Sequence, residues 1–280
     1  MTISQGFQSF AGQHFIVTGS TQGLGAAVAH LLAERGAAGL VICGRNQAKG
    51  LHQVEQLAAL GCEALFVPTD LTQEQDLKQL VDAGVDRFGT LHGLVNCAGM
   101  SDRGGILDTS SKLFDDIFAT NVKAPFFLMQ HLIKHMIQHQ IEGRIVNIVT
   151  MTSHGGQSFL TPYAASKGAL ATLTKNVAFS AMRNRIRVNG LNIGWMDTPH
   201  EHEIQQRYHQ ADENWLEKAE AGQPFGRLLK PAEVAQSVAF LLSEESGMMT
   251  GALIDLDQGI IGCDDQGTPK PLHALTLPVG

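Results

Sequence analysis

Thr18-Gly19-Ser20-Thr21-Gln22-Gly23-Leu24-Gly25 is the stretch of sequence that decides the fold. It follows a short β-branched run, residues 14–18, and leads directly into a stretch of helical periodicity, residues 24–35. Glycine allows a tight turn and lets a pyrophosphate approach the backbone without a Cβ in the way. The free N–H groups and the positive end of the following helix would meet the phosphate charge. The spacing differs from the common GxGxxG fingerprint, so a plain tight connection between strand and helix stays open as the alternative.

The alternation of short apolar runs with longer helical stretches continues along the chain. Seven runs have the length and β-branched content of buried strands, namely residues 14–18, 40–43, 64–67, 91–95, 144–149, 186–191 and 252–255. Six stretches have helical periodicity, namely residues 24–35, 48–60, 73–88, 113–139, 163–182 and 232–242. This order predicts an α/β fold, a single Rossmann-type doubly wound domain with a seven-stranded parallel sheet and helices on both faces.

We expect this domain to cover residues 1–262. A polar segment at about 195–222 interrupts the alternation between a strand and a helix. A long insertion in that position often acts as a lid, and a solvated helical excursion is the alternative. Residues 263–280 contain three prolines and predict an irregular C-terminal extension.

Composition excludes several classes of protein. A net charge of −7 argues against a nucleic-acid or anionic-membrane partner. No apolar run reaches the roughly 18–20 residues needed to span a bilayer, and the first residues lack the pattern of a signal peptide. The four cysteines form no CxxC pair and no zinc-ligand spacing, so we expect neither disulfides nor a metal site. The cytoplasm is the expected location.

Further motifs follow the glycine-rich turn in order. Asn96-Cys97-Ala98-Gly99 follows the fourth predicted strand, Asn121 lies in a predicted helix, and Tyr163 stands four residues before Lys167. With these motifs the chain resembles the short-chain dehydrogenase/reductase family from about residue 12 to residue 259. Cys97 replaces an asparagine of the family signature. The resemblance implies an NAD(P)-dependent oxidoreductase that interconverts a secondary alcohol and a ketone by hydride transfer.

Tyr163 and Lys167 are the centre of the expected chemistry. Residues four apart share one face of a helix. A phenol with a pKa near ~10 is a poor base at neutral pH, but a nearby ammonium and an oxidised nicotinamide should both lower that pKa. Tyr163 could then act as the acid/base of the reaction. The resemblance implies that Asn121 holds a water beside Lys167, and a capping or buried amide is the alternative.

The hydroxyl expected beside the tyrosine is where the chain departs from the family. A serine usually stands 13 residues before the tyrosine, and that position is Thr150 here. Threonine keeps the hydroxyl that would hydrogen-bond the substrate oxygen. Ser153 is the second candidate for this role, and Thr152 is a weaker one. We also expect Trp195 to line the substrate site.

The resemblance implies further cofactor contacts from the ends of several strands. Besides Tyr163 and Lys167, the expected cofactor-binding residues are Gly19, Thr21, Gln22, Gly23, Leu24, Gly25, Arg45, Asp70, Leu71, Asn96, Ala98, Gly99, Ile193 and Thr198. An acidic residue after the second strand would select NAD, but this position is Gly44 and Arg45 follows it. Because an arginine suits a 2′-phosphate, we expect NADP(H) to be preferred, with NAD(H) as the alternative. Asp70 could instead cap the helix that follows it.

The residues expected around the substrate are largely polar. Arg103, His154, Gln157 and His202 favour a small hydroxylated molecule such as a sugar or polyol over a lipid. Two other functions remain open, a 3-oxoacyl-thioester (carrier protein) reductase and a non-catalytic dinucleotide sensor. The resemblance also implies a homo-oligomer, a tetramer or a dimer, paired through long helices.

Overall fold

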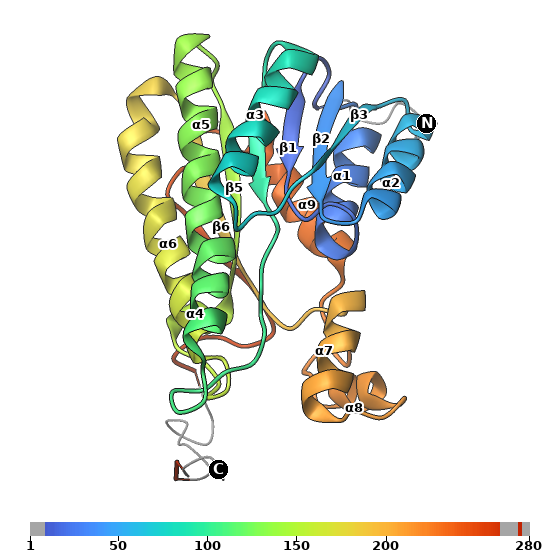
Figure 1. Ribbon diagram of the computed structural model, residues 1–280, viewed down its shortest axis with the longest axis vertical. Helices are drawn as coiled ribbons and strands as arrows, with labels where there is room; N and C mark the ends of the chain where they lie inside the picture. The colour runs from blue at the N-terminus through green and yellow to red at the C-terminus, as the bar shows by residue number, and fades with distance from the viewer. Residues whose placement is uncertain (1–8, 264–273, 276–280) are drawn as a thin grey trace.

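Figure 1 shows the computed structural model of the protein, which describes residues 9–263 and 274–275. Its centre is a sheet of seven strands in the order β3-β2-β1-β4-β5-β6-β7. The strands are β1 His14–Val17, β2 Gly39–Gly44, β3 Glu63–Pro68, β4 Gly93–Asn96, β5 Arg144–Thr150, β6 Arg187–Ile193 and β7 Leu253–Leu256. Every neighbouring pair is parallel, which confirms the predicted seven-stranded parallel sheet.

Helices cover both faces of this sheet, as predicted (Figure 1). One layer contains α1 Gly23–Glu34, α2 Gln47–Ala59 and α9 Pro231–Leu242; the other contains α3 Glu74–Phe88, α5 Ala124–Gln138 and α6 Thr161–Ala181. Successive residues of a strand point to opposite faces. Phe15 and Val17 of β1 accordingly pack into a core with α1 and α9, whereas Ile16 packs into a second core with α3 and α5.

The strand order reverses between β1 and β4. These two strands are direct neighbours, and the chain leaves them toward opposite sides of the sheet. Open α/β sheets bind ligands at the carboxyl ends of strands where this reversal occurs. The glycine-rich turn follows β1, and the segment Asn96–Gly99 follows β4, so the fold brings both motifs to this point.

The helix predicted at residues 113–139 is interrupted. It consists of α4 Ser111–Phe118, a π-helical segment Ala119–Lys123, and α5. Pro125 lies in the first turn of α5 and has no N–H to donate to the carbonyl four residues back. That carbonyl belongs to Asn121, which explains why the regular α-helical pattern fails there.

The predicted insertion at 195–222 contains two helices, α7 Pro199–His209 and α8 Trp215–Ala221. They lie beyond the carboxyl end of β6, below the sheet in Figure 1. Short 3₁₀ segments occur at Met151–His154, Met182–Asn184 and Glu244–Ser246. None of the helices among residues 9–263 is long and apolar enough to cross a membrane. Apart from Cys263 and residues 274–275, the predicted C-terminal extension lies outside the described residues.

Candidate active site

The glycine-rich turn is fixed tightly against its neighbours. The Ser20 hydroxyl donates to the Val17 carbonyl at 2.7 Å and accepts from the Cys43 N–H at 3.0 Å, so β1 and β2 both hold the turn. A Cβ on Gly25 would lie 2.4 Å from the Gly19 carbonyl oxygen. Gly25 therefore has to be glycine for α1 to start this close to the strand end.

The N-terminus of α1 has no side-chain cap among the described residues. The first turn of this helix contains no acidic residue, and the N-cap residue Gln22 makes no capping bond with its side chain. The first N–H groups of a helix have no partner within the helix. Gly23 has a φ of +57°, and only Thr198 from the loop after β6 comes within 4 Å of its missing Cβ. These features fit a pyrophosphate lying between the turn and Thr198.

The segment after β4 closes the other side of this crevice. The Ala98 N–H donates to the Thr18 hydroxyl at 3.1 Å, and a Cβ on Gly19 would lie 3.0 Å from the Ala98 Cα. Asn96 is buried and donates to the Asn147 side chain at 2.8 Å. Gly99 lies against the catalytic candidates, because a Cβ there would be 3.4 Å from the Lys167 Nζ.

Thr150, Tyr163 and Lys167 lie together where β5 ends and α6 begins. The hydroxyl of Thr150 hydrogen-bonds the phenol of Tyr163 and also accepts from the Thr152 hydroxyl at 3.3 Å. Lys167 is buried, donates to the Ile148 carbonyl at 2.7 Å, and places its Nζ 6.0 Å from the centre of the Tyr163 ring. Thr150 is thus the hydroxyl beside the tyrosine, and its role in orienting the substrate stays a prediction.

The protein's own groups shift both ionisable side chains toward their neutral forms. Burial raises the pKa of Tyr163 to about 12, although the hydrogen bond from Thr150 opposes this shift. Burial lowers the pKa of Lys167 to about 8. The expected low pKa of Tyr163 is therefore not found in the protein alone, because burial of the phenol has the largest effect.

Asn121 is fully buried in the π-helical segment, and its side chain is used completely. Its Oδ1 accepts from the Met100 N–H at 2.8 Å, and its Nδ2 donates to the Met100 carbonyl and the Ser166 hydroxyl, each at 2.9 Å. The side chain thus joins the segment after β4 to α6. The carbonyl of Asn121 lacks the N–H that residue 125 would donate in a regular α-helix, because that residue is Pro125.

The end of β2 is where cofactor choice is expected. A Cβ on Gly44 would lie 2.8 Å from the Thr21 side chain, so a carboxylate could not stand there without moving Thr21. Arg45 is exposed and is close enough to contribute to the lowered pKa of Asp70. Asp70 accepts chiefly from the backbone and side chain of Thr72, and it is not the N-cap of α3.

The remaining candidates lie around this crevice. Gln22 accepts from the Lys49 ammonium at 2.6 Å, Leu71 packs partly into the core, and Ile193 ends β6. Ser153 lies in the 3₁₀ segment beside Thr152, one turn beyond Thr150. Trp195 is 40% exposed and donates to Glu201.

Sequence reasoning missed the side chains through which the insertion reaches the site. The end of α7 contacts the loop after β4. Tyr208 donates to Asp102 at 2.7 Å, and Arg103 donates to His209 at 3.2 Å. Glu201 approaches Arg103 to 3.9 Å. Arg103 was expected in the substrate region, but Glu201 was not named as a candidate, because no local sequence signal pairs one side chain of α7 with one side chain of that loop.

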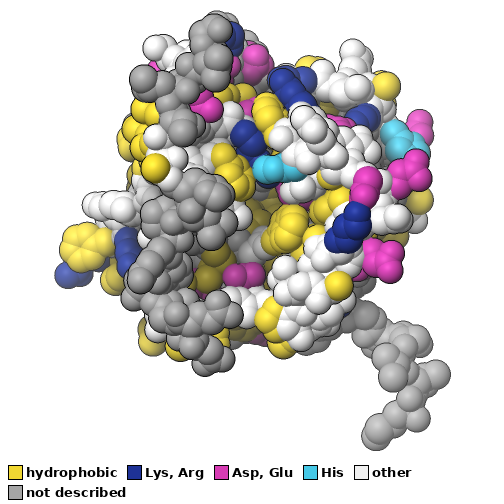
Figure 2. Space-filling model, turned by 90° about the horizontal axis from the view of Figure 1, so that it is seen from below, with side chains coloured by type: hydrophobic (Ala, Val, Ile, Leu, Met, Phe, Trp, Pro, Cys, Tyr) yellow, Lys and Arg dark blue, Asp and Glu magenta, His cyan; other side chains and the backbone are white. Residues whose placement is uncertain are grey.

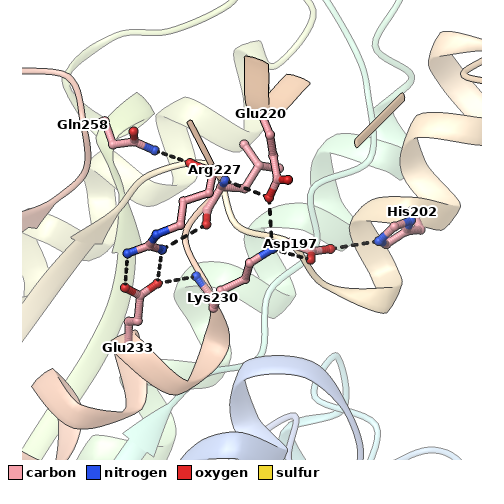
Figure 3. Close-up of polar contacts among 8 residues, drawn as sticks. Asp197, His202, Glu220, Arg227, Lys230, Glu233 and Gln258 are labelled. Atoms are coloured by element: carbon pink, nitrogen blue, oxygen red, sulfur yellow. Dashed lines mark hydrogen bonds and ion pairs between the residues drawn. The ribbon is translucent and has the colours of Figure 1, made fainter. Parts of the chain in front are cut away.

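The beginning of α7 is held by a second polar cluster, drawn in Figure 3. The Lys230 ammonium lies 2.9 Å from Asp197 and 3.0 Å from Glu220, and Asp197 also contacts His202 at 2.8 Å. The hydrogen bonds that Lys230 donates to Asp197 and Glu220 raise its pKa. This cluster, Asp197–His202–Glu220–Lys230, ties the insertion to the start of α9.

Figure 2 looks at the molecule from the side of the insertion, along the carboxyl ends of the strands. This face is hollowed near its centre, and hydrophobic side chains gather in the hollow. Charged side chains surround it on the described part of the surface (Figure 2). Among the described residues, no group of three or more His, Cys, Asp or Glu side chains could hold a metal ion.

Comparisons with known proteins agree on one class. A family model described as Enoyl-(Acyl carrier protein) reductase matches residues 19–261. L-fucose dehydrogenase of Mus musculus is 33% identical over 236 residues, which are 84% of this chain and 84% of that relative. A crystal structure of an actinorhodin polyketide ketoreductase variant with NADPH has a TM-score of 0.84 and 28% identity, and covers 91% of this chain and 98% of its own. The structure of NAD+-bound xylitol dehydrogenase has a TM-score of 0.82 and 28% identity, and covers 89% of this chain and 99% of its own.

Proposed function

The chain belongs to the short-chain dehydrogenase/reductase family, and on that premise we propose that it oxidises or forms a secondary alcohol on a sugar or polyol with Tyr163 as acid and base. It is a nicotinamide-dependent oxidoreductase that acts on CH–OH and C=O groups. The observation that carries the proposed mechanism is the contact between Thr150 and Tyr163 beside the buried ammonium of Lys167. The relatives named for L-fucose and xylitol support the substrate class.

The residues of the crevice fit a dinucleotide. The free N-terminus of α1, the close approach of Gly25 to Gly19, and the nearby Thr198 would hold the pyrophosphate. Asp70 and Leu71 would face the adenine end, and Asn96, Ala98, Gly99 and Ile193 the nicotinamide end. When bound, the nicotinamide accepts or supplies the hydride.

Tyr163 performs the proton transfer in this proposal. Thr150 holds the substrate oxygen through its hydroxyl, and Tyr163 takes the proton from the alcohol or gives it to the ketone. A pKa of about 12 for Tyr163 makes the phenolate scarce at neutral pH. Positive charge beside the phenol lowers this pKa, and Lys167 supplies such a charge while it is protonated, below about pH 8. The carbonyl of Asn121 would bind the water that links Lys167 to solvent.

Thr152, Ser153 and Trp195 would line the substrate side, and the 195–222 insertion would act as a lid. The contacts of Tyr208 and His209 with the loop after β4 support this role, because they hold the insertion against a loop that we expect to line the site. The same segment contains Glu201, Glu203, Glu213, Glu217 and Glu220. An acidic carrier protein would be repelled by this segment, which argues against a 3-oxoacyl-thioester reductase even though one similar structure is a polyketide ketoreductase.

We further propose that NADP(H) is preferred over NAD(H). The close contact that a side chain at position 44 would make with Thr21 and the exposed Arg45 support this preference. One similar structure contains NADPH and the other contains NAD+, so the choice depends on residues of this chain.

Titration with NADPH and NADH, followed by nicotinamide fluorescence, tests the cofactor proposal. We expect tighter binding of NADPH, lost in Arg45→Ala and kept in the control Arg183→Ala, whose side chain is exposed after α6. Equal affinities in the wild type would refute the role of Arg45. Turnover of L-fucose and xylitol, abolished in Tyr163→Phe while NADPH binding stays intact, tests the catalytic proposal. A variant with tight NADPH binding and full turnover would exclude Tyr163 as the acid/base, and binding without any turnover in the wild type would favour the sensor.

A homo-oligomer and a cytoplasmic location complete the proposal. The α4–α6 side of the molecule exposes large apolar side chains, including Phe114, Phe126 and Phe179. Burying such a surface against a second copy would stabilise a dimer or tetramer, which light scattering would detect. The four free cysteines fit a reducing compartment.

A further inference from the structure

Two side chains of opposite charge face each other close to Tyr163 without forming a hydrogen bond. Arg103 comes from the loop after β4 and Glu201 from α7. The Arg103 Nη2 lies 3.9 Å from the Glu201 Oε1, and only 13% and 17% of their side chains are exposed. A charge removed from water to this degree needs hydrogen bonds to offset the lost hydration.

The guanidinium of Arg103 is held in place but not fully used. Its Nε donates to His209 at 3.2 Å, its Nη1 donates to the Ser101 carbonyl at 2.9 Å, and the group lies over the Phe159 ring. Among the described residues, Nη2 has no acceptor within hydrogen-bond distance. Arg103 is therefore held in position, and its Nη2 can still donate a hydrogen bond to a ligand.

The carboxylate of Glu201 has an oxygen that accepts no hydrogen bond from the described side chains. Its Oε1 accepts from the Trp195 indole at 2.9 Å and from Gln205 at 2.7 Å. Its Oε2 has no donor among the described side chains. Glu201 is thus fixed by Oε1, the oxygen that also lies nearest to the Arg103 Nη2, and it retains acceptor capacity at Oε2.

Both charges act on the reacting phenol. The loop that carries Arg103 lies against the chain just before Tyr163, because the Gly104 N–H donates to the Phe159 carbonyl at 2.9 Å and the Thr161 N–H donates to the Gly104 carbonyl at 3.1 Å. In keeping with this position, Glu201 raises the pKa of Tyr163 and Arg103 lowers it. The two charges cancel, so this part of the site does not select for a charged ligand. A ligand group that accepts from Arg103 and donates to Glu201 would satisfy both.

We propose that Arg103 and Glu201 together bind a hydroxyl group adjacent to the reacting carbinol, so that the substrate is a neutral vicinal diol. A hydroxyl both donates and accepts, whereas a carboxylate only accepts and an ammonium only donates. A carboxylate would be repelled by Glu201 and an ammonium by Arg103. The exposed face of Trp195, held by the same Glu201, would cover the carbon skeleton. This inference rests on the proposed function above and assigns its substrate class.

The test uses three probes that differ at one position of the same ring. Cyclohexanol, cyclohexane-1,2-diol in both diastereomers, and 2-hydroxycyclohexanecarboxylate are offered to the full chain with NADP+ and with NAD+. We expect kcat/KM to be about 10- to 100-fold higher for at least one diol than for cyclohexanol, the effect of hydrogen bonds to charged groups. Glu201→Gln and Arg103→Gln should each bring this ratio close to one.

Two variants on the same helix are matched controls. Glu203→Gln and Arg207→Gln alter side chains that are 69% and 70% exposed, and both should keep the wild-type ratio. Arg207→Gln also removes an ion pair between α7 and Asp102, so a general loosening of the insertion would change the rates with all probes alike and leave their ratio unchanged.

Each other outcome has a distinct meaning. Equal turnover of cyclohexanol and both diols by the wild type would overturn the inference and leave the proposed function standing. Preference for the carboxylate probe, increased by Glu201→Gln and abolished by Arg103→Gln, would also overturn it, because Arg103 would then bind an anion. If neither these probes nor L-fucose and xylitol are oxidised with either cofactor, the proposed function fails, and the inference with it.

Discussion

Replacing Gly25 by alanine should displace the cofactor turn by a purely steric effect. The added Cβ would lie 2.4 Å from the Gly19 carbonyl oxygen and 2.7 Å from its carbon. Because carbon–oxygen contacts normally lie at about 3.3 Å or more, the overlap is about 0.9 Å. The neighbour is backbone, and Ser20 ties that backbone to β1 and β2, so the turn cannot yield easily.

The size of the effect follows from this overlap. Overpacking usually costs about 1–3 kcal/mol, and the fixed backbone places Gly25→Ala at about 3 kcal/mol. This corresponds to a fall in Tm of roughly 6–12 °C for a chain of this size. Since the displaced N–H groups are those proposed to bind the pyrophosphate, NADPH affinity should fall by at least about tenfold.

Gly23→Ala separates steric overlap from backbone strain. Gly23 has a φ of +57°, but no atom lies nearer than 3.9 Å to its missing Cβ. An alanine there should cost only about 1–2 kcal/mol, from the left-handed conformation alone. Thermal unfolding and NADPH fluorescence titration of both variants check the reasoning. If Gly25→Ala is no less stable than Gly23→Ala and binds NADPH like the wild type, the steric argument is wrong.

Three further perturbations test other parts of the structure. Thr150→Val removes the hydroxyl beside Tyr163 and should lower kcat by about 10- to 100-fold, whereas Thr150→Ser should stay within a few-fold; equal rates for both variants would exclude this hydroxyl from the reaction. Burial lowers the pKa values of His92 and His135 below the ordinary histidine value, so the unfolded chain takes up protons first. The stability that these neutral histidines contribute is thus present above about pH 6.5 and is lost as the pH falls toward their folded values, and urea unfolding at pH 7.5 and 5.5 should show a smaller drop in His135→Gln than in the wild type. Arg187 donates to the Ser246 hydroxyl at 2.7 Å and to the Ser243 carbonyl at 2.8 Å, both beyond the end of α9. Arg187→Met should therefore lower the free energy of unfolding by about 3 kcal/mol. A loss below about 1 kcal/mol would contradict that role.

The sheet was predictable because buried parallel strands leave a local signal. Each predicted strand lies within about two residues of an observed one, and the glycine-rich turn identifies the crevice. The interruption at Asn121 was not predicted, because a π-helical segment keeps the apolar periodicity on both sides nearly unchanged. Pro125, four residues later, was the available signal.

The partners of the candidate site depend on distant parts of the chain. Thr150 was found by its spacing from Tyr163 within one motif. The contact between Arg103 and Glu201 joins residues nearly a hundred positions apart, and no periodicity or spacing encodes it. The neighbouring Lys167 predicts a low pKa for Tyr163 from the sequence, but burial of the phenol dominates in the protein alone.

The contacts that hold the two ends of α7 bear on the rate of product release. The beginning of the helix continues from β6 and is secured by Asp197 and Lys230, whereas its end rests on Asp102 and Arg103 through Tyr208 and His209. A product leaving the crevice would therefore pass the end of α7, where only side-chain contacts must break. If this departure limits kcat, added salt should speed the enzyme by screening the ion pair between Arg207 and Asp102, while the hydride-transfer step measured in a single turnover stays unchanged.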